Sequence, residues 1–71
     1  MSEFWERVEG TRIALNAHGE LSRAELARRA NIAVSTIDKG LSRRSRPNGA
    51  VRRQIERVLE EEQARQQGEA A

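Results

Sequence analysis

A chain of 71 residues has room for one small domain, and with one Phe, one Trp and 37% hydrophobic residues its core must come mainly from Leu, Ile, Val and Ala. No apolar run approaches the ~18 residues that a membrane span needs, and the N-terminus carries no secretory signal pattern. Cys is absent, which excludes disulfides and thiolate metal sites but does not locate the protein. With neither a membrane span nor a signal pattern, we expect a cytoplasmic domain that binds no cofactor.

The net charge of +2 hides a strong segregation of charge along the chain. Residues 1–21 carry two basic and four acidic side chains, residues 22–57 carry ten and three, and residues 58–71 carry one and four, for net charges of −2, +7 and −3. A basic middle between acidic ends is typical of a domain whose surface binds a polyanion.

The first predicted helix runs from Ser2, as its N-cap, to about Ala17. Trp5 is interpreted as a core anchor, because a lone aromatic in an acidic segment makes a poor stacking surface for single-stranded nucleic acid. His18 and Gly19 mark the end of the helix, and with no second His and no Cys a catalytic or metal role for His18 is not favoured. The apolar stripe of this helix consists of Phe4, Trp5, Val8, Thr11, Ile13 and Leu15.

A second helix and a tight turn are predicted next. Ser22 and Glu25 have the spacing of a capping box, in which each side chain bonds to the backbone amide of the other residue. Asn31 tolerates left-handed backbone geometry better than other non-Gly residues, so it marks the turn, and Ile32 after it is expected to pack into the core. The inward face of this helix carries Leu26, Ala27 and Ala30.

The third predicted helix is short, from about residue 34 to residue 39. It buries one large residue, Ile37, and is expected to end at Gly40, with Leu41 folding back as an apolar contact after the cap. A helix that displays mostly small polar side chains contributes little to a core and is well suited to contact another molecule.

The last predicted helix follows a loop at residues 42–48, where Pro47 disfavours helix at Arg46. Asn48 is its N-cap, and the helix is expected to run from Gly49 to about Gln63. We therefore expect one domain over residues 1–63 and a flexible acidic and polar tail over residues 64–71. The apolar stripe of the last helix is formed by Val51, Ile55, Val58 and Leu59.

Several short segments between residues 21 and 48 match the sequence pattern of a known family of domains at the same spacing. They are Leu21-Ser22-Arg23, Glu25-Leu26-Ala27, the turn Asn31-Ile32, Ser35-Thr36-Ile37 and Arg46-Pro47-Asn48. In these segments the chain resembles the helix-turn-helix domains of the lambda-repressor/Cro-like (Xre-type) superfamily. Its FWERV segment and arginine loop resemble, more loosely, the N-terminal domains of LexA/CI-like phage-type repressors. The resemblance implies an all-α, compact four-helix or five-helix bundle that contains a helix-turn-helix.

The sequence departs from the family pattern at two positions. Asn31 stands where the turn usually has Gly, and Gly40 stands where the recognition helix generally has an apolar residue. The second departure implies a recognition helix one turn shorter, with Leu41 as its anchor. A fifth, dimerising helix is not evident.

The resemblance also implies which residues meet DNA, with the recognition helix in the major groove and the helix before it across the backbone. Residues 43–46 are then a phosphate clamp or, in the plainer interpretation, a soluble loop, and Ser35 and Thr36 are base contacts or only a secondary cap. Arg28, Arg29 and Arg57 are interpreted as solvated helix arginines. The implied base contacts are Val34, Ser35, Thr36, Asp38 and Lys39. The implied backbone contacts are Ser22, Arg23, Arg43, Arg44, Arg46, Asn48, Arg52 and Arg53.

The function implied is a sequence-specific double-stranded DNA-binding module of a bacterial or phage-encoded transcriptional regulator, foremost a repressor associated with the nucleoid. Binding as a homodimer, through a C-terminal domain beyond this chain, fits that role. The alternative is a small helical adaptor that uses its basic face to dock a protein. An enzyme is not expected, because the sequence shows no nucleophile–base pair, metal set or phosphate-binding glycine loop, and it indicates no small-molecule site or membrane partner.

Overall fold

The computed structural model describes residues 3–43 and 46–70, with side chains as far as residue 68. In this part of the chain the regular structure consists of helices: α1 (Phe4–Leu15), α2 (Arg23–Ala30), α3 (Val34–Arg43) and α4 (Gly49–Ala70). The predicted all-helical class is confirmed for these residues. Ser2, the predicted N-cap of the first helix, lies outside them, and Glu3 holds the N-cap position.

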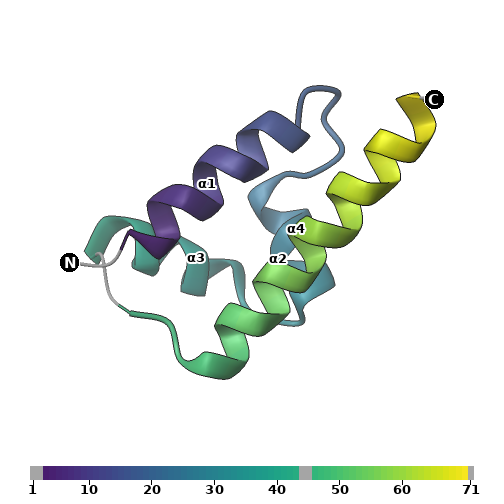
Figure 1. Ribbon diagram of the computed structural model, residues 1–71. Helices are drawn as coiled ribbons and strands as arrows, with labels where there is room; N and C mark the ends of the chain where they lie inside the picture. The colour runs from purple at the N-terminus through teal and green to yellow at the C-terminus, as the bar shows by residue number, and fades with distance from the viewer. Residues whose placement is uncertain (1–2, 44–45, 71) are drawn as a thin grey trace.

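The four helices pack around one apolar core (Figure 1). The long helix α4 packs against α1 and α2, and α3 packs against the same two helices from the other side of the molecule. In the view of Figure 1, α1 and α4 lie in front and α2 and α3 behind them. The core is built from Phe4, Trp5, Val8, Leu15, Leu21, Leu26, Ala27, Ala30, Ile37, Ile55, Val58 and Leu59.

Helix α1 buries most of its predicted apolar stripe but not Ile13, whose side chain is 58% exposed. The inward position belongs to Arg12, which donates from Nη1 to the carbonyl oxygen of Leu21 at 3.0 Å. Arg12 lies four residues after buried Val8 and three before buried Leu15, so it continues their face, and Ile13 is turned one residue away from it. The inclusion of Ile13 in the core stripe was wrong, because the buried position is polar.

The end of α1 also differs from the prediction. The helix stops at Leu15 rather than Ala17, and Asn16 accepts a hydrogen bond at its Oδ1 from the Leu21 amide at 2.8 Å. Gly19 has a φ of +75°, a left-handed conformation that favours Gly, as its predicted place after the helix end requires.

Helix α2 starts with half of the predicted capping box. The Ser22 hydroxyl accepts from the Glu25 amide at 3.1 Å, but the Glu25 carboxylate accepts from Arg28 at 3.0 Å and Arg29 at 2.8 Å instead of returning to Ser22. The turn is confirmed, because Asn31 has φ 59° and ψ 44°. Ile32 donates its amide to the carbonyl of Ala27 at 2.9 Å and packs, partly buried, on the core.

Helix α3 continues to Arg43, so the predicted end at Gly40 was wrong. Gly40 lies inside the helix and against the indole ring of Trp5, where a β-carbon at residue 40 would come within 2.2–2.5 Å of three ring atoms. The Gly at this position is therefore explained by a close approach of two helices and not by a helix end. Leu41 stays in the helix, half-buried against the core, and Ser42 and Arg43, which the sequence assigned to the following loop, are helical as well.

Helix α4 begins where predicted, since Asn48 accepts at Oδ1 from the Val51 amide at 2.8 Å. It continues to Ala70, however, so residues 64–70 are helical where the sequence predicted a flexible tail. The extension has a polar anchor: Glu62 is 1% exposed, and Gln66 donates both to Glu62 at 2.8 Å and to the Leu15 carbonyl at 2.7 Å. These contacts tie the second half of α4 to the end of α1.

Candidate nucleic-acid interface

Helix α3 has one buried side and one exposed side. Ile37 and Gly40 face the core, and they fix α3 against Trp5 and the rest of the bundle. Four of the five predicted base-contacting residues are exposed, whereas the side chain of Thr36 is half-buried beside the core. The exposed four are Val34, Ser35, Asp38 and Lys39.

The extra turn of α3 lengthens this exposed side. Ser35, Asp38, Lys39 and Ser42 follow one another at three- and four-residue spacing and therefore share a face, which we call the α3 face. Ser42 donates its hydroxyl to the Asp38 carbonyl at 3.0 Å. Ser42 was not predicted on this face because Gly40 was expected to end the helix, although its seven-residue spacing from Ser35 fits the face.

Arg23, a predicted backbone contact, lies at the centre of an ion-pair network that joins three helices. Its Nη1 donates to Asp38 Oδ1 of α3 at 2.9 Å, and its Nη2 and Nε donate to Glu9 Oε2 of α1 at 2.6 and 3.0 Å. Glu9 also accepts from Arg12 at 2.7 and 3.1 Å. The network could not be predicted from the sequence, because Glu9 is 14 residues from Arg23 along the chain. Nothing in the sequence distinguishes Glu9 from the other glutamate of α1.

The Glu9 carboxylate is strongly held in its charged form. Hydrogen bonding from Arg12 and then from Arg23 outweighs partial burial and lowers the pKa of Glu9 to about 2. Arg23 therefore has a fixed anion on its α1 side at neutral pH, and the same interaction raises the pKa of its own guanidinium. Since a guanidinium has five N–H donors and the network engages one on each of its three nitrogens, two donors of Arg23 stay available to a further acceptor.

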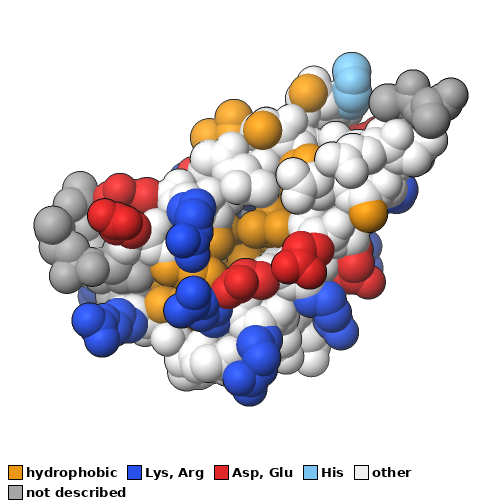
Figure 2. Space-filling view, in the orientation of Figure 1, with side chains coloured by type: hydrophobic (Ala, Val, Ile, Leu, Met, Phe, Trp, Pro, Cys, Tyr) orange, Lys and Arg blue, Asp and Glu red, His pale blue; other side chains and the backbone are white. Residues whose placement is uncertain are grey.

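Basic side chains gather where α3 ends and α4 begins. Figure 2 shows Lys and Arg side chains along the lower edge of the view, over the start of α4. Arg43, Arg46 and Arg53 are exposed and, like Lys39, make no ion pair with any residue that the structure describes. Arg44 falls outside the described residues.

Arg52 is more constrained than its basic neighbours. It pairs with Glu56 at 2.8 Å, and its guanidinium carbon lies 5.5 Å from the centroid of the Phe4 ring. The remaining predicted backbone contacts, Ser22 and Asn48, are exposed N-caps of α2 and α4. They stand at helix ends where backbone amides and the helix dipole favour a negatively charged partner.

Two other kinds of site were searched for in the described ranges, 3–43 and 46–70. No group of three or more His, Asp or Glu side chains there is placed to hold a metal ion. No helix in those ranges is both long and apolar enough to cross a membrane.

Comparison of the chain with known proteins found no matching family model, no matching curated protein and no matching solved structure. Any function proposed for the chain therefore rests on the chemistry of the α3 face and of the basic side chains beside it.

Proposed function

We propose that the protein is a sequence-specific double-stranded DNA-binding module of a transcriptional regulator, foremost a repressor, in which α2, the Asn31 turn and α3 act as a helix-turn-helix. The observation that carries this proposal is the α3 face, a row of exposed polar side chains on a helix fixed to the core by Ile37 and Gly40. A helix of ten residues is about 15 Å long, which suits insertion into a major groove.

The side chains of the α3 face offer the chemistry that base edges require. Lys39 can donate to the acceptors of guanine, and the hydroxyls of Ser35 and Ser42 can donate or accept. Asp38 can accept from the amino group of cytosine with the carboxylate oxygen that Arg23 does not occupy. Val34, which is 42% exposed at the start of α3, offers methyl groups to the methyl of thymine.

The basic side chains beside the α3 face suit the phosphate backbone. Arg43, Arg46 and Arg53 are exposed around the end of α3 and the start of α4. Arg23 has two N–H donors outside its ion-pair network, and we propose that they bind phosphate as well. Such contacts supply affinity and set the orientation of the domain without reading sequence. Two such domains on half-sites about one helical turn apart would give useful affinity, so we propose a homodimer on DNA.

Substitutions at Lys39 and Arg46 should distinguish base recognition by Lys39 from phosphate binding by Arg46. In a selection from random duplexes, Lys39→Ala is expected to change the preferred base at one or two positions, with about tenfold loss of discrimination there. Arg46→Ala is expected to weaken all sequences alike and to reduce the slope of log affinity against log salt by about one.

The matched control is Arg57→Ala, an exposed arginine of α4 outside both groups, which should leave affinity and preference unchanged. Equal and sequence-blind losses from Lys39→Ala and Arg46→Ala would contradict the assignment of the α3 face as the reading surface. Unchanged DNA binding in both variants would favour the docking of a protein on the basic face.

A further inference from the structure

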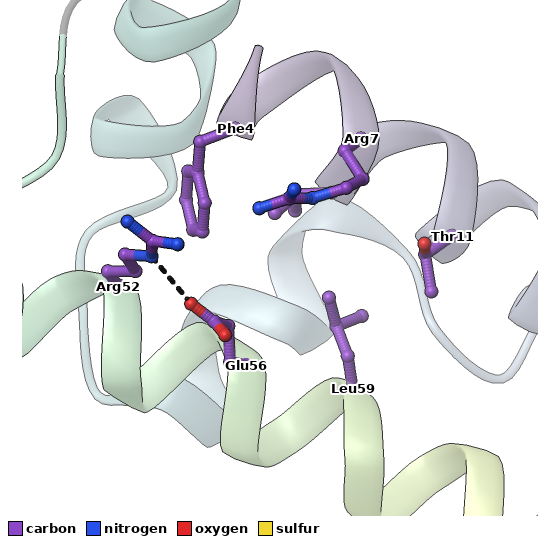
Figure 3. A pocket seen from close by; sticks show the side chains of 7 residues that line it. Phe4, Arg7, Thr11, Arg52, Glu56 and Leu59 are labelled. Atoms are coloured by element: carbon purple, nitrogen blue, oxygen red, sulfur yellow. Dashed lines mark hydrogen bonds and ion pairs between the residues drawn. The ribbon is translucent and has the colours of Figure 1, made fainter. Parts of the chain in front are cut away.

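A pocket of about 380 Å³ opens between α1 and α4 (Figure 3). Its inner wall is apolar and comes from both helices, and two arginines and one glutamate stand around it. The volume lies within the range of sites that hold small organic molecules, about 300–1,000 Å³. The residues that define it are Phe4, Val8 and Leu59 on the inner wall and Arg7, Thr11, Arg52 and Glu56 around them.

The charges around the pocket favour an anion. Arg52 is paired with Glu56, whereas Arg7 is exposed and makes no ion pair with any residue in the described ranges. Figure 3 shows the guanidinium groups of Arg7, from α1, and Arg52, from α4, both extended toward the Phe4 ring. With two cations and one carboxylate, the pocket carries one positive charge in excess beside an apolar wall.

The apolar wall is held in place before any ligand arrives. Phe4 packs edge-on against Trp5, with ring centroids 5.2 Å apart and an interplanar angle of 78°. Trp5 is itself seated on Gly40 of α3, and the Arg52 guanidinium covers the other partner, Phe4, at 5.5 Å. A wall that is already ordered costs a ligand little conformational entropy.

We propose that this pocket binds a small amphipathic carboxylate, an organic acid with a short apolar chain. The carboxylate is held by Arg7 and Arg52, and the chain lies over the small part of Phe4, Val8 and Leu59, 4–8% of each residue, that stays exposed in the pocket. The pocket opens between α1 and α4, in front of α2 and α3 in the view of Figure 1, and none of its residues belongs to the α3 face. Arg52, which the sequence also implied as a DNA backbone contact, is the one residue common to the two proposed sites.

Trp5 provides a built-in reporter of binding. It is the single Trp of the chain, it is buried, and it contacts the Phe4 ring that forms the pocket wall. A ligand chain placed on Phe4 changes the surroundings of the indole, so binding should alter Trp fluorescence without any added label.

Octanoate is a suitable probe, because it does not absorb where Trp emits or is excited. We expect a saturable change of Trp5 emission with a dissociation constant of about a millimolar, as befits a ligand of this size. In amide NMR spectra the shifts should be confined to the start of α1 and the part of α4 around Glu56 and Leu59. Arg7→Gln is expected to weaken binding about fivefold, since a charged hydrogen bond at an exposed site is lost.

The controls separate this site from general anion or detergent binding. Arg57→Gln, an exposed arginine elsewhere on α4, should bind octanoate like the parent protein, and circular dichroism should show unchanged helix content in every variant. Arg52→Gln is the second test of the charged wall and should also weaken binding. The proposal would be overturned if 1-octanol or inorganic phosphate bound as tightly as octanoate, or if Arg7→Gln and Arg52→Gln bound octanoate as tightly as the parent protein. NMR shifts spread over the whole domain would overturn it as well.

Discussion

Replacing Gly40 with Ala is expected to lower the free energy of unfolding by about 3 kcal/mol and the Tm by about 15 °C. An added β-carbon would lie 2.2–2.5 Å from Cε2, Cδ2 and Nε1 of Trp5, far inside van der Waals contact. The clash is with the body of a rigid, buried ring and not with the end of a flexible side chain, so either the indole or the whole of α3 has to move. Thermal and urea unfolding followed by circular dichroism measure the effect.

Gly10→Ala is the matched control for this experiment. Gly10 also lies inside a helix, but nothing lies within 4 Å of the position of its β-carbon. Ala at this position should stabilise the protein by about 0.5–1 kcal/mol, through helix propensity alone. If Gly40→Ala behaved like Gly10→Ala, the close packing of α3 on Trp5 would be wrong.

Replacing Glu62 with Gln is expected to cost about 2 kcal/mol of stability at neutral pH. The buried carboxylate accepts from Arg29 at 2.6 Å, from Arg65 Nε at 3.2 Å and from Gln66 at 2.8 Å, and Arg65 Nη2 donates to it as well. These donors, Arg65 foremost and then Gln66 and Arg29, outweigh burial and lower the pKa of Glu62 to about 2. A neutral amide cannot replace a charged acceptor for two guanidinium groups.

The stability that Glu62 contributes should depend on pH in a definite direction. Its pKa is lower in the folded protein than the ordinary value of 4.5, so the contribution is fully present above that value and is lost as the pH falls toward 2. The difference between the parent protein and Glu62→Gln should therefore be largest at neutral pH and shrink through this acidic window.

Urea unfolding at several pH values measures the effect, with Glu61→Gln as the control. Glu61 is the preceding residue of α4, but its side chain is 70% exposed and 3.9 Å from Arg57, so its loss should change stability by less than about 0.5 kcal/mol. A difference between Glu62→Gln and the parent that stayed constant from neutral to acidic pH would contradict the charged, hydrogen-bonded state of Glu62.

Features set by local backbone chemistry could be predicted from the sequence. The Asn31 turn needs a residue that adopts positive φ, and Asn48 needs only its own side chain and the amide of Val51 to start α4. The helical class and the buried apolar positions of α2 and α4 follow from apolar spacing in the same way.

Features set by contacts between distant residues could not be predicted. Gly40 looked like a helix end because nothing near it in the sequence shows that Trp5 occupies the space of its β-carbon. The extension of α4 was missed for a related reason: Glu62 is buried, but its partners are polar and one of them, Arg29, belongs to α2. An apolar stripe cannot reveal a helix that is anchored by ion pairs.

The candidate site was predictable to a similar extent. The sequence placed five residues on the outer face of α3, and the structure exposes all of them except Thr36, which is half-buried: Val34, Ser35, Thr36, Asp38 and Lys39. It did not show that Arg23 is held between Glu9 and Asp38, so the carboxylate of Asp38 is oriented by α2 before it meets any partner. Ion-pair networks of this kind join residues that are far apart in the sequence and become neighbours only when the chain folds.

Titration of the protein into random duplex DNA at rising salt concentration tests the central claim most directly. We expect binding at low salt, with log affinity falling linearly against log salt and a slope of about −3 to −4, as for contacts to about four phosphates. Arg43, Arg46, Arg53 and Arg23 are the described side chains expected to make these contacts. No binding at low salt, or an affinity that did not change with salt, would contradict DNA binding through the α3 face and the basic side chains beside it.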